Sequence, residues 1–274
     1  MPELPEVETT LLGIKPHILY QTIKSCVIRQ PQLRWPIPTD KLVRLNGYRI
    51  DSIERRGKYL ILTIHDGAIL IHLGMSGCLQ IVSEDQAINK HDHVDIQFTN
   101  HVILRYTDPR RFGAILWAAN DPYQHPLIAK LGLEPFAPQF TGEYLHKQAV
   151  MRKCPVKSLI MDNKTVVGVG NIYATEALFG AKIHPTTPAN KLSLQHMNVL
   201  VEQIKAILQR AITQGGTTLK DFLNSDGKPG YFIQQLQVYG RAGLPCLHCR
   251  TPIRSMRIGQ RTTCFCINCQ HDLT

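Results

Sequence analysis

The sequence predicts an α+β protein of two domains, the second of which ends in a small metal-binding hairpin. Short strand-like runs dominate residues 1–131. Helical periodicity marks residues 139–236, which follow a proline-marked linker at 132–138. Two pairs of cysteines lie within residues 237–274. A chain of 274 residues is long enough for two ordinary domains, each with its own hydrophobic core.

The composition favours a globular protein with a polyanionic partner. Hydrophobic residues make up 43%, which is typical of globular chains, and no apolar run reaches the length of about 18 residues that suggests a membrane span. Lysine and arginine total 31 against 21 acidic residues, giving a formal charge of +10. This balance favours a nucleic acid over a membrane, because no basic amphipathic helix stands out. The acidic N-terminus does not resemble a signal peptide, so we expect a cytoplasmic location.

The N-terminal segment predicts an amphipathic helix from about Leu4 to about Leu19. Its apolar residues recur with helical spacing at Val7, Leu11, Ile14 and Ile18. Proline and glutamate are both common at the start of a helix, which explains the opening residues structurally. Pro16 is expected either to kink this helix or to end it early.

The same opening residues also suit nucleophilic catalysis. If Met1 is removed, Pro2 becomes a secondary amine, and an α-amino group has a pKa of about 8, well below that of lysine. Such an amine attacks sugar carbons to form a Schiff base. Glu3 and Glu6 lie beside it and could act as a general acid or base. The structural and the catalytic interpretations are compatible, because a rigid helix would aim the terminus.

Seven short runs after this helix have the composition of β-strands, which favours a sandwich or a barrel over a parallel sheet. The runs are Thr22–Arg29, Tyr48–Arg55, Tyr59–Ile64, Ala68–His72, Asp92–Phe98, His101–Thr107 and Ala114–Ala118. Asp66-Gly67 is a typical hairpin turn between two of them, and Thr99-Asn100 is a second candidate.

The loops between these runs carry the polar and flexible residues. They are Arg55-Arg56-Gly57-Lys58, His72-Leu73-Gly74-Met75-Ser76-Gly77, Lys90-His91-Asp92-His93 and Asp108-Pro109-Arg110-Arg111-Phe112-Gly113. Each of these loops also has a structural explanation. The arginine-rich loops could be exposed basic turns, the methionine could belong to the core, and the segment with two histidines could be the polar start of a strand. Alternatively, an arginine and an aromatic side chain at one loop tip could insert into DNA.

Residues 139–236 contain two helices with distinct signals. Apolar residues recur on one face from Leu194 to Ala211, and Ser193 is a candidate N-cap. Gly168 and Gly170 precede a second helix that opens at Asn171, where free backbone N–H groups could face a phosphate; a packing turn is the alternative. The Gly-rich polar stretch 215–230 suits a mobile lid.

The cysteines near the C-terminus predict one structural Zn²⁺. Cys246-x2-Cys249-x16-Cys266-x2-Cys269 has the spacing of a four-cysteine zinc site. Four thiolates close the coordination shell, so the metal is structural and not catalytic. Cys264 is left over, because pairing it with Cys266 would lose the two-residue spacing.

Eight motifs, in the same order, resemble bacterial formamidopyrimidine-DNA glycosylase across nearly the whole chain. They are PELPEVE, RRGK, HLGMSG, KHDH, DPRRFG, MDNK, GVGNIYATEALF and QRxT before the second cysteine pair. The resemblance implies an N-terminal β-sandwich flanked by helices, followed by a helix-two-turn-helix domain with a four-cysteine zinc-finger hairpin. It also implies a bifunctional DNA glycosylase, which excises oxidised purines such as 8-oxoguanine and formamidopyrimidines and then cleaves the abasic site by β,δ-elimination.

The resemblance assigns roles to individual residues. Pro2 is implied as the nucleophile and Glu3 as its acid, with Lys58 and Arg261 supporting elimination. The side chains implied to contact DNA are Met75, Arg110 and Phe112, which fill the gap left by the flipped base, together with Glu6, His72, His91, Arg152 and Asn171. Arg110 is implied to read the opposite cytosine. At Arg152 the family often has lysine, which puts that contact in doubt.

Two alternatives remain from the residues. The related endonuclease VIII family prefers oxidised pyrimidines, but Leu4 and the intact DPRRFG motif favour the purine enzyme. A non-catalytic zinc protein that binds DNA would not need a free proline terminus. The resemblance implies a monomer that acts on duplex DNA carrying an oxidised purine, preferably opposite cytosine, in the bacterial cytoplasm and at the nucleoid, with no membrane partner.

Overall fold

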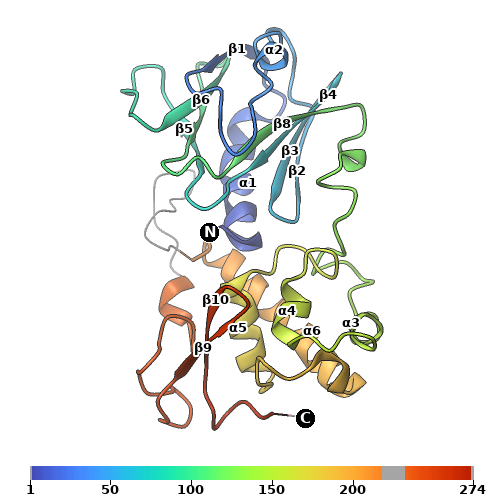
Figure 1. The fold of residues 1–274 in the computed structure, drawn as a ribbon. Coiled ribbons are helices and arrows are strands. Elements are labelled where there is room, and N and C mark those ends of the chain that lie inside the picture. The colour runs from blue at the N-terminus through green and yellow to red at the C-terminus, as the bar shows by residue number, and fades with distance from the viewer. Residues whose placement is uncertain (1, 218–231, 273–274) are drawn as a thin grey trace. The chain divides into compact units, whose positions relative to one another are not determined.

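A computed structural model describes residues 2–217 and 232–272 (Figure 1). The chain divides into two compact units, which are described separately. The first comprises Met1–Ala129 with Gln214–Tyr231, and the second comprises Lys130–Thr213 with Phe232–Thr274. The domain limits expected from the sequence stay predictions. The sequence did not predict that the chain returns to the first unit after the long helix.

The first unit contains two four-stranded antiparallel sheets (Figure 1). One has the order β1-β6-β7-β5 and the other the order β2-β3-β4-β8. The strands are β1 (Ile23–Ile28), β2 (Ser52–Arg56), β3 (Tyr59–Ile64), β4 (Gly67–His72), β5 (Cys78–Val82), β6 (Asp92–Phe98), β7 (Ile103–Thr107) and β8 (Ala114–Ala119). The short helices of this unit are α2 (Thr39–Leu42) and the 3-10 turn η1 (Pro122–Gln124).

Both sheets and the first helix share one hydrophobic core, as expected of a β-sandwich flanked by a helix. Helix α1 (Leu4–Ile18) contributes Leu11 and Ile14, while Leu60 of β3 and Phe98 of β6 represent the two sheets. Pro16 lies inside α1 and does not end it, because a proline near the last turn removes little of the helical hydrogen bonding. The predicted helix and the predicted sandwich are therefore confirmed.

The strands differ from the expectation by more than one residue in three places. Strand β5 was not predicted, because its burial pattern does not alternate along the strand. Strand β2 begins at Ser52 and not at Tyr48, since Tyr48 bonds to Ile23 at the start of β1 and Ile50 bonds to the segment before β1. Strand β7 begins at Ile103, because the turn before it places His101 at a φ of 64° and closes with Phe98 N donating to Val102 O.

The second unit contains the helices and the zinc hairpin. Its helices are α3 (Gly142–Ala149), α4 (Val156–Met161), α5 (Asn171–Gly180), α6 (Leu194–Thr213) and the 3-10 turns η2 (Ala189–Lys191) and η3 (Phe232–Gln235). Helix α6 packs on α3 and α5. The predicted cap is present, because the backbone N–H of His196 donates to Ser193 Oγ at 3.3 Å.

A two-stranded hairpin follows, formed by β9 (Arg254–Ile258) and β10 (Arg261–Phe265). Phe179 of α5 packs in one cluster with Val238, Ile253 and Cys264 of this region, so the hairpin rests on the helix. Within residues 2–217 and 232–272, no helix is both long and apolar enough to cross a membrane.

Candidate functional site

The start of α1 holds Pro2 and Glu3 in a fixed arrangement. Both residues are buried, and Glu3 occupies the N-cap position. The backbone N–H of Glu3 donates to Glu6 Oε2 at 2.8 Å, while the Glu3 carboxylate accepts from the backbone N–H of Glu6. This reciprocal capping box satisfies two N–H groups at the helix start and leaves the backbone before it little freedom.

Glu6 also binds the chain that returns after α6. Its second oxygen, Oε1, accepts from the backbone N–H of Thr217 at 2.7 Å. Gly215 and Gly216 precede this contact at φ values of 74° and 81°, and a Cβ on Gly216 would lie 3.2 Å from the Glu6 side chain. The expected lid at 215–230 lies, beyond Thr217, outside the described residues.

Lys58 lies in the turn between β2 and β3, where Gly57 adopts a φ of 59°. Arg55 ties this turn to α1, because its Nε donates to Glu8 Oε2 at 2.5 Å and its Nη1 to Gly57 O at 3.1 Å. The sequence singled out the turn for Lys58 but gave no role to the Arg55–Glu8 pair.

His72 ends β4 and is held neutral. Burial lowers its pKa to about 4, and the positive charges of Lys58 and Arg34 add to this effect. Its ring lies 4.8 Å from the ring of Tyr59, and its Nδ1 accepts from the backbone N–H of Gly74 at 3.0 Å. The imidazole therefore fixes the first residues of the loop that carries Met75.

The side chains expected to fill a gap in DNA lie on two loops that touch. Met75 is 38% exposed and Phe112 is 45% exposed, which is high for apolar side chains. The guanidinium of Arg110 lies 4.8 Å from the centre of the Phe112 ring. Gly74, at a φ of 65°, allows the contact between the loops, since a Cβ there would lie 2.4 Å from Gly113 N. The structure thus places the three predicted side chains on two neighbouring loops that are in contact.

His91 lies beside the turn Asp108–Gly113, which carries Arg110 and Phe112. Its backbone carbonyl accepts from the N–H of Asp108 at 3.1 Å, and its ring lies 6.3 Å from the ring of His93. His93 in turn contacts Asp108 O through Nε2 at 2.8 Å. The His91 loop and the Asp108–Gly113 turn are therefore joined through backbone atoms.

In the second unit, Asn171 connects the start of α5 to the hairpin. Its Oδ1 accepts from Lys157 Nζ at 2.6 Å, and its Nδ2 donates to Thr262 O at 3.0 Å. The fully buried Lys157 also donates to Thr263 Oγ1 at 2.6 Å. Arg261, the first residue of β10, is exposed next to this network.

Arg152 makes contacts within the protein as well. Its Nη1 donates to Asp162 Oδ2 at 2.9 Å and to Thr165 Oγ1 at 3.3 Å, and its side chain is 35% exposed. Its partners within the described part of the second unit do not include Asn171 or Arg261, so the structure does not bring these three together by bonding.

Glu176 is a buried acid that the sequence analysis missed. Burial raises the pKa of this carboxyl, although hydrogen bonds from backbone N–H groups and the charge of Arg210 oppose the effect. The carboxylate accepts from Gln237, Val238 and Tyr239 at 2.8–3.0 Å and so anchors the segment that leads to the zinc hairpin. A single acid within the apolar run of α5 gave no signal for these bonds, because their donors lie 61–63 residues later in the chain.

The four predicted ligand cysteines form one cluster. The sulfur atoms of Cys246, Cys249, Cys266 and Cys269 all lie within 4.8 Å of one another. Two of the separations are 3.4 and 3.9 Å, close to the roughly 3.8 Å expected between sulfurs at the corners of a tetrahedral zinc–thiolate site. Cys264 is outside the cluster, as predicted, and the donor set fits a structural zinc ion.

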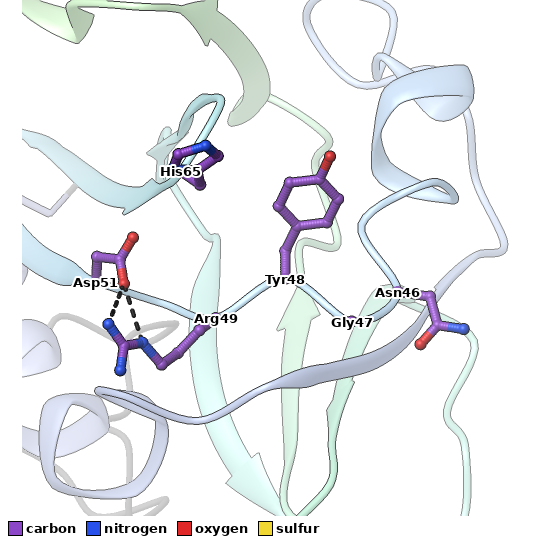
Figure 2. Close-up of a pocket in the computed structure, with 6 residues that line it drawn as sticks. All are labelled: Asn46, Gly47, Tyr48, Arg49, Asp51 and His65. Carbon is purple, nitrogen blue, oxygen red and sulfur yellow. Dashed lines mark hydrogen bonds and ion pairs between the residues drawn. The ribbon is translucent and has the colours of Figure 1, made fainter.

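One surface pocket of the first unit contains none of the predicted site residues. It is lined by Asn46, Gly47, Tyr48, Arg49, Asp51 and His65 (Figure 2). Several of its polar groups bond to each other or to neighbours, as in the Arg49–Asp51 pair at 2.9 Å and the bond from Tyr48 to Asp66 at 2.6 Å. The chemistry-bearing residues of this unit are therefore on the loops and at the start of α1, not in this pocket.

Three family models match consecutive parts of the chain. Residues 1–115 match the formamidopyrimidine-DNA glycosylase N-terminal domain, residues 131–223 match the H2TH domain of the same enzyme, and residues 243–271 match a zinc finger found in FPG and IleRS. Curated relatives named formamidopyrimidine-DNA glycosylase are similar over their full length. Those of Salmonella arizonae and Marinobacter nauticus are 55% and 52% identical, covering 98% of this chain and 100% of each relative.

Solved structures are similar over the same extent. The MutM (FPG) protein of Thermus thermophilus is 35% identical with a TM-score of 0.87, and 98% of each chain is covered. A mutant FPG protein of Lactococcus lactis, solved in complex with Fapy-dG-containing DNA, is 33% identical with a TM-score of 0.90, covering 98% of this chain and 99% of that one. The L. lactis protein in complex with abasic-site DNA is 34% identical with a TM-score of 0.89 over the same shares.

Proposed function

The chain belongs to the formamidopyrimidine-DNA glycosylase family, and from this membership we propose which of its residues carry out the reaction. The protein is a base-excision repair glycosylase for oxidised purines with associated AP-lyase activity, its partner is DNA, and it holds one structural zinc ion. The full-length relatives named formamidopyrimidine-DNA glycosylase favour this enzyme over an endonuclease VIII-like enzyme and over a non-catalytic zinc protein.

Base excision begins at Pro2. With Met1 removed, the secondary amine attacks C1′ of the damaged nucleotide, a bond forms between nitrogen and C1′, and the glycosidic bond breaks. The electron pair leaves with the base, which gains a proton, and Glu3 is the acid that supplies it. Loss of the base leaves the Pro2 nitrogen bonded to C1′. The nitrogen then loses its proton, the bond from C1′ to O4′ breaks and O4′ gains a proton, which opens the sugar and leaves an iminium, the Schiff base, at C1′. The observation that supports this assignment is the capping box, which holds Pro2 and Glu3 rigidly at the start of α1.

Strand cleavage follows as two eliminations. A proton leaves C2′ and the bond from C3′ to its oxygen breaks. In the second elimination a proton leaves C4′ and the bond from C5′ to its oxygen breaks, and in each step the phosphate oxygen keeps the electron pair. Lys58 and Arg261 support these steps as cations at the flanking phosphates. The neutral state of His72 favours this role of Lys58, because the ring adds no positive charge that would compete with the Lys58 ammonium for a phosphate. The zinc cluster supports Arg261 from the other end of β10.

Met75, Arg110 and Phe112 fill the space left by the flipped nucleotide. Unstacking a base costs a few kcal/mol, and inserted apolar side chains recover part of that cost. The exposure of Met75 and Phe112 supports this role. Arg110 hydrogen-bonds the base that remains, which gives the preference for cytosine opposite the lesion. His91, Arg152 and Asn171 are proposed to contact the DNA backbone, and the enzyme acts as a monomer.

Glu6 and His72 are proposed to support the DNA-binding elements from within. The carboxylate of Glu6 already accepts from Glu3 and Thr217, and the Nδ1 of His72 accepts from Gly74. These bonds direct the two side chains toward the protein backbone. Their contribution to DNA binding is therefore the placement of the N-terminus and of the Met75 loop.

Glu3→Gln tests the assignment of the acid. Glutamine keeps an oxygen that can accept from the N–H of Glu6, so the helix cap is preserved. Excision of 8-oxoguanine should fall by roughly 100-fold or more, the usual range for loss of a general acid. Cleavage of a duplex that already contains an abasic site should fall far less.

Glu143→Gln is the matched control, since Glu143 lies in the first turn of α3 and should leave both rates unchanged. Equal losses of excision and of abasic-site cleavage in Glu3→Gln would show that Glu3 serves only to cap the helix.

A further inference from the structure

Asp108 is a buried carboxylate to which the reaction assigns no part. It is fully buried at the end of β7 and accepts four hydrogen bonds through its side chain. Oδ1 accepts from Ser76 Oγ at 2.7 Å and from Arg110 N at 3.3 Å. Oδ2 accepts from Gly113 N at 2.9 Å and from Tyr106 OH at 3.2 Å. Its donors therefore come from both loops that carry the gap-filling side chains.

Ser76 provides the direct connection between these loops. It is 4% exposed, and its hydroxyl donates to Asp108 while accepting from the backbone N–H of Arg110 at 3.3 Å. One hydroxyl group thus links the residue next to Met75 with the residue that is proposed to read cytosine. A buried polar group with all its bonds satisfied rigidifies its surroundings.

Glycines bring the rest of the two loops into contact. A Cβ on Gly77 would lie 2.7 Å from Tyr106 Oη, and one on Gly113 would lie 1.8 Å from it. A Cβ on Gly74 would lie 2.4 Å from both Gly113 N and Phe112 C. Burial and the charge of Asp108 raise the pKa of Tyr106, so its hydroxyl remains a donor. The loops therefore pack backbone to backbone around one buried carboxylate.

We propose that Asp108, through Ser76, is a positioning residue that couples the Met75 loop to the Arg110–Gly113 turn, so that Met75, Arg110 and Phe112 enter DNA as one unit. The proposal rests on the function proposed above for these three side chains. Arg110 can discriminate between cytosine and adenine only if its guanidinium keeps one position when either base lies opposite the lesion. Hydrogen bonds are directional, so a donor that is held in place fits one base and not the other. Coupling to the Met75 loop supplies that constraint, and selectivity for cytosine over adenine depends on it.

Ser76→Ala tests the coupling without introducing a new charge or more volume. The ratio of single-turnover excision rates, 8-oxoguanine opposite cytosine over 8-oxoguanine opposite adenine, should fall about five-fold, the effect of one hydrogen bond. A partly unfolded preparation would lower both rates alike and leave this ratio unchanged. Ser25→Ala is the matched control, because it also removes a hydroxyl bonded to a side chain, Gln97 Oε1 at 2.6 Å, but on β1.

A double-mutant cycle measures the coupling directly. In the otherwise unchanged protein, the effects of Met75→Ala and Phe112→Ala on excision should be non-additive, because the two side chains act as one unit. In the Ser76→Ala background the same two effects should become additive. Asp108→Asn should lower the opposite-base ratio further, because an amide presents hydrogens to donors that need an acceptor.

The outcomes separate this inference from the function on which it rests. Arg110→Ala must itself lower the opposite-base ratio; if it does not, the reading role of Arg110 and the coupling both fail. If Arg110→Ala lowers the ratio while Ser76→Ala behaves like Ser25→Ala and the cycle stays non-additive, the coupling alone is overturned. A lower ratio in Ser76→Ala together with additivity in its background establishes the coupling.

Discussion

At the scale of single residues, the neutral state of His72 determines what its neighbours can do. A protonated imidazole could not accept the N–H of Gly74 through Nδ1, so the bond that fixes the start of the Met75 loop requires the neutral ring. Burial and two nearby cations lower its pKa to about 4, so the ring stays neutral at any pH above that value. Between that value and the roughly 6.5 of an unfolded histidine, the unfolded chain binds a proton that the native chain does not. Stability therefore falls as the pH falls through this window.

Removing the charge of Lys58 should raise the pKa of His72. In Lys58→Gln the pKa should lie above about 4, yet still below the usual histidine value because burial is the larger cause. An NMR titration of the imidazole measures it. Lys24→Gln, which changes an exposed lysine on β1 paired with Glu84, is the control and should leave the titration unchanged. An unchanged pKa in Lys58→Gln would show that the Lys58 ammonium does not face His72.

The chemistry of the candidate site could be predicted where it depends on residue type and on short-range spacing. Pro2 as a possible amine and the four zinc ligands belong to this class. The roles of Asp108 and Glu176 could not be predicted, because each depends on donors distant in sequence: Ser76 for Asp108, and the segment 237–239 for Glu176. Ser76, for example, is brought to Asp108 only by the fold. A single acidic residue in a turn or in an apolar helix gives no signal of that kind.

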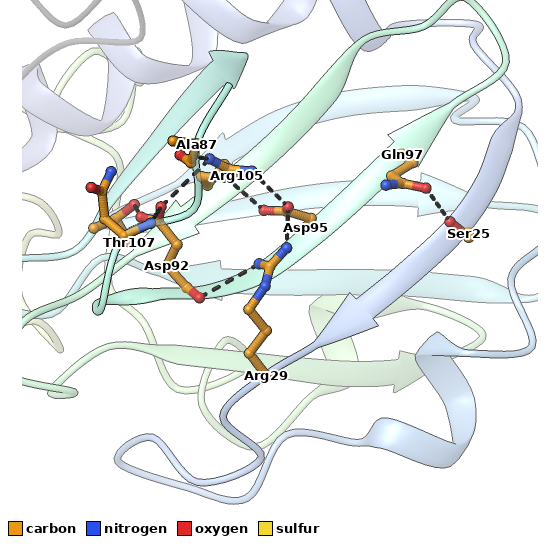
Figure 3. Close-up of polar contacts among 9 residues, drawn as sticks. Ser25, Arg29, Ala87, Asp92, Asp95, Gln97, Arg105 and Thr107 are labelled. Atoms are coloured by element: carbon orange, nitrogen blue, oxygen red, sulfur yellow. Dashed lines mark hydrogen bonds and ion pairs between the residues drawn. The ribbon is translucent and has the colours of Figure 1, made fainter. Parts of the chain in front are cut away.

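At the scale of elements, the sheet β1-β6-β7-β5 contains a buried ionic network (Figure 3). Arg105 binds Asp95 through Nε and Nη2 at 2.9 and 3.0 Å, and Arg29 Nη2 binds the same carboxylate at 2.6 Å. Asp92 accepts from Thr107 Oγ1 at 2.6 Å and from the backbone N–H of Asn89 at 2.7 Å. This network joins β6 and β7 beside the His91 loop and so supports a predicted DNA contact.

Asp95→Asn should destabilise the protein by about 3 kcal/mol at neutral pH, because it removes the closest carboxylate of the buried Arg105 and leaves only Asp92, at 3.5 Å, as an ion-pair partner among the described residues. Burial opposes ionisation, but the two arginines lower the pKa of Asp95 below its usual value. Its contribution is thus present above the unfolded pKa of about 3.9 and is lost as the pH falls through the native value. Urea unfolding at several pH values should show the deficit of the variant shrinking in acid.

Asp51→Asn is the control for this series, since Asp51 forms an exposed pair with Arg49 and should change stability by no more than about 1 kcal/mol. A deficit of Asp95→Asn that matched the control at neutral pH would mean that the network adds nothing to the sheet.

Element types could be predicted better than element boundaries. Strands β3 and β6 match the expected runs, since their apolar content and flanking turns are local signals. Strand β5 could not be predicted, because both of its faces are partly covered and alternation is lost. The start of β2 was displaced because the carbonyl of Tyr48 accepts from the N–H of Ile23 at the start of β1, a contact between residues distant in sequence.

At the scale of the whole molecule, the zinc site determines whether the hairpin can exist. The cluster that packs against Phe179 consists largely of the cysteines themselves, so the apolar core of the hairpin is small. In such a module metal binding supplies most of the folding free energy. The first unit has its own core of both sheets and α1 and does not depend on the metal.

Removal of zinc by a chelator should unfold the hairpin and leave the sandwich intact. Hydrogen exchange should rise in β9 and β10 while β3 and β4 stay protected, and DNA cleavage should be lost with Arg261. Cys264→Ser should retain one zinc ion per chain, whereas Cys249→Ser should lose it, as judged by metal analysis. Loss of the metal from Cys264→Ser would contradict the assignment of the four ligands.

The most direct test of the central claim is borohydride trapping on a defined duplex. The purified protein, with Met1 removed, is mixed with DNA that carries 8-oxoguanine opposite cytosine, the complex is reduced, and the adduct is mapped by mass spectrometry. We predict one covalent adduct, on the nitrogen of Pro2, because a Schiff base there is the intermediate common to excision and strand cleavage. An adduct on Lys58, or binding of the duplex with no adduct at all, would contradict the assignment of Pro2 as the nucleophile.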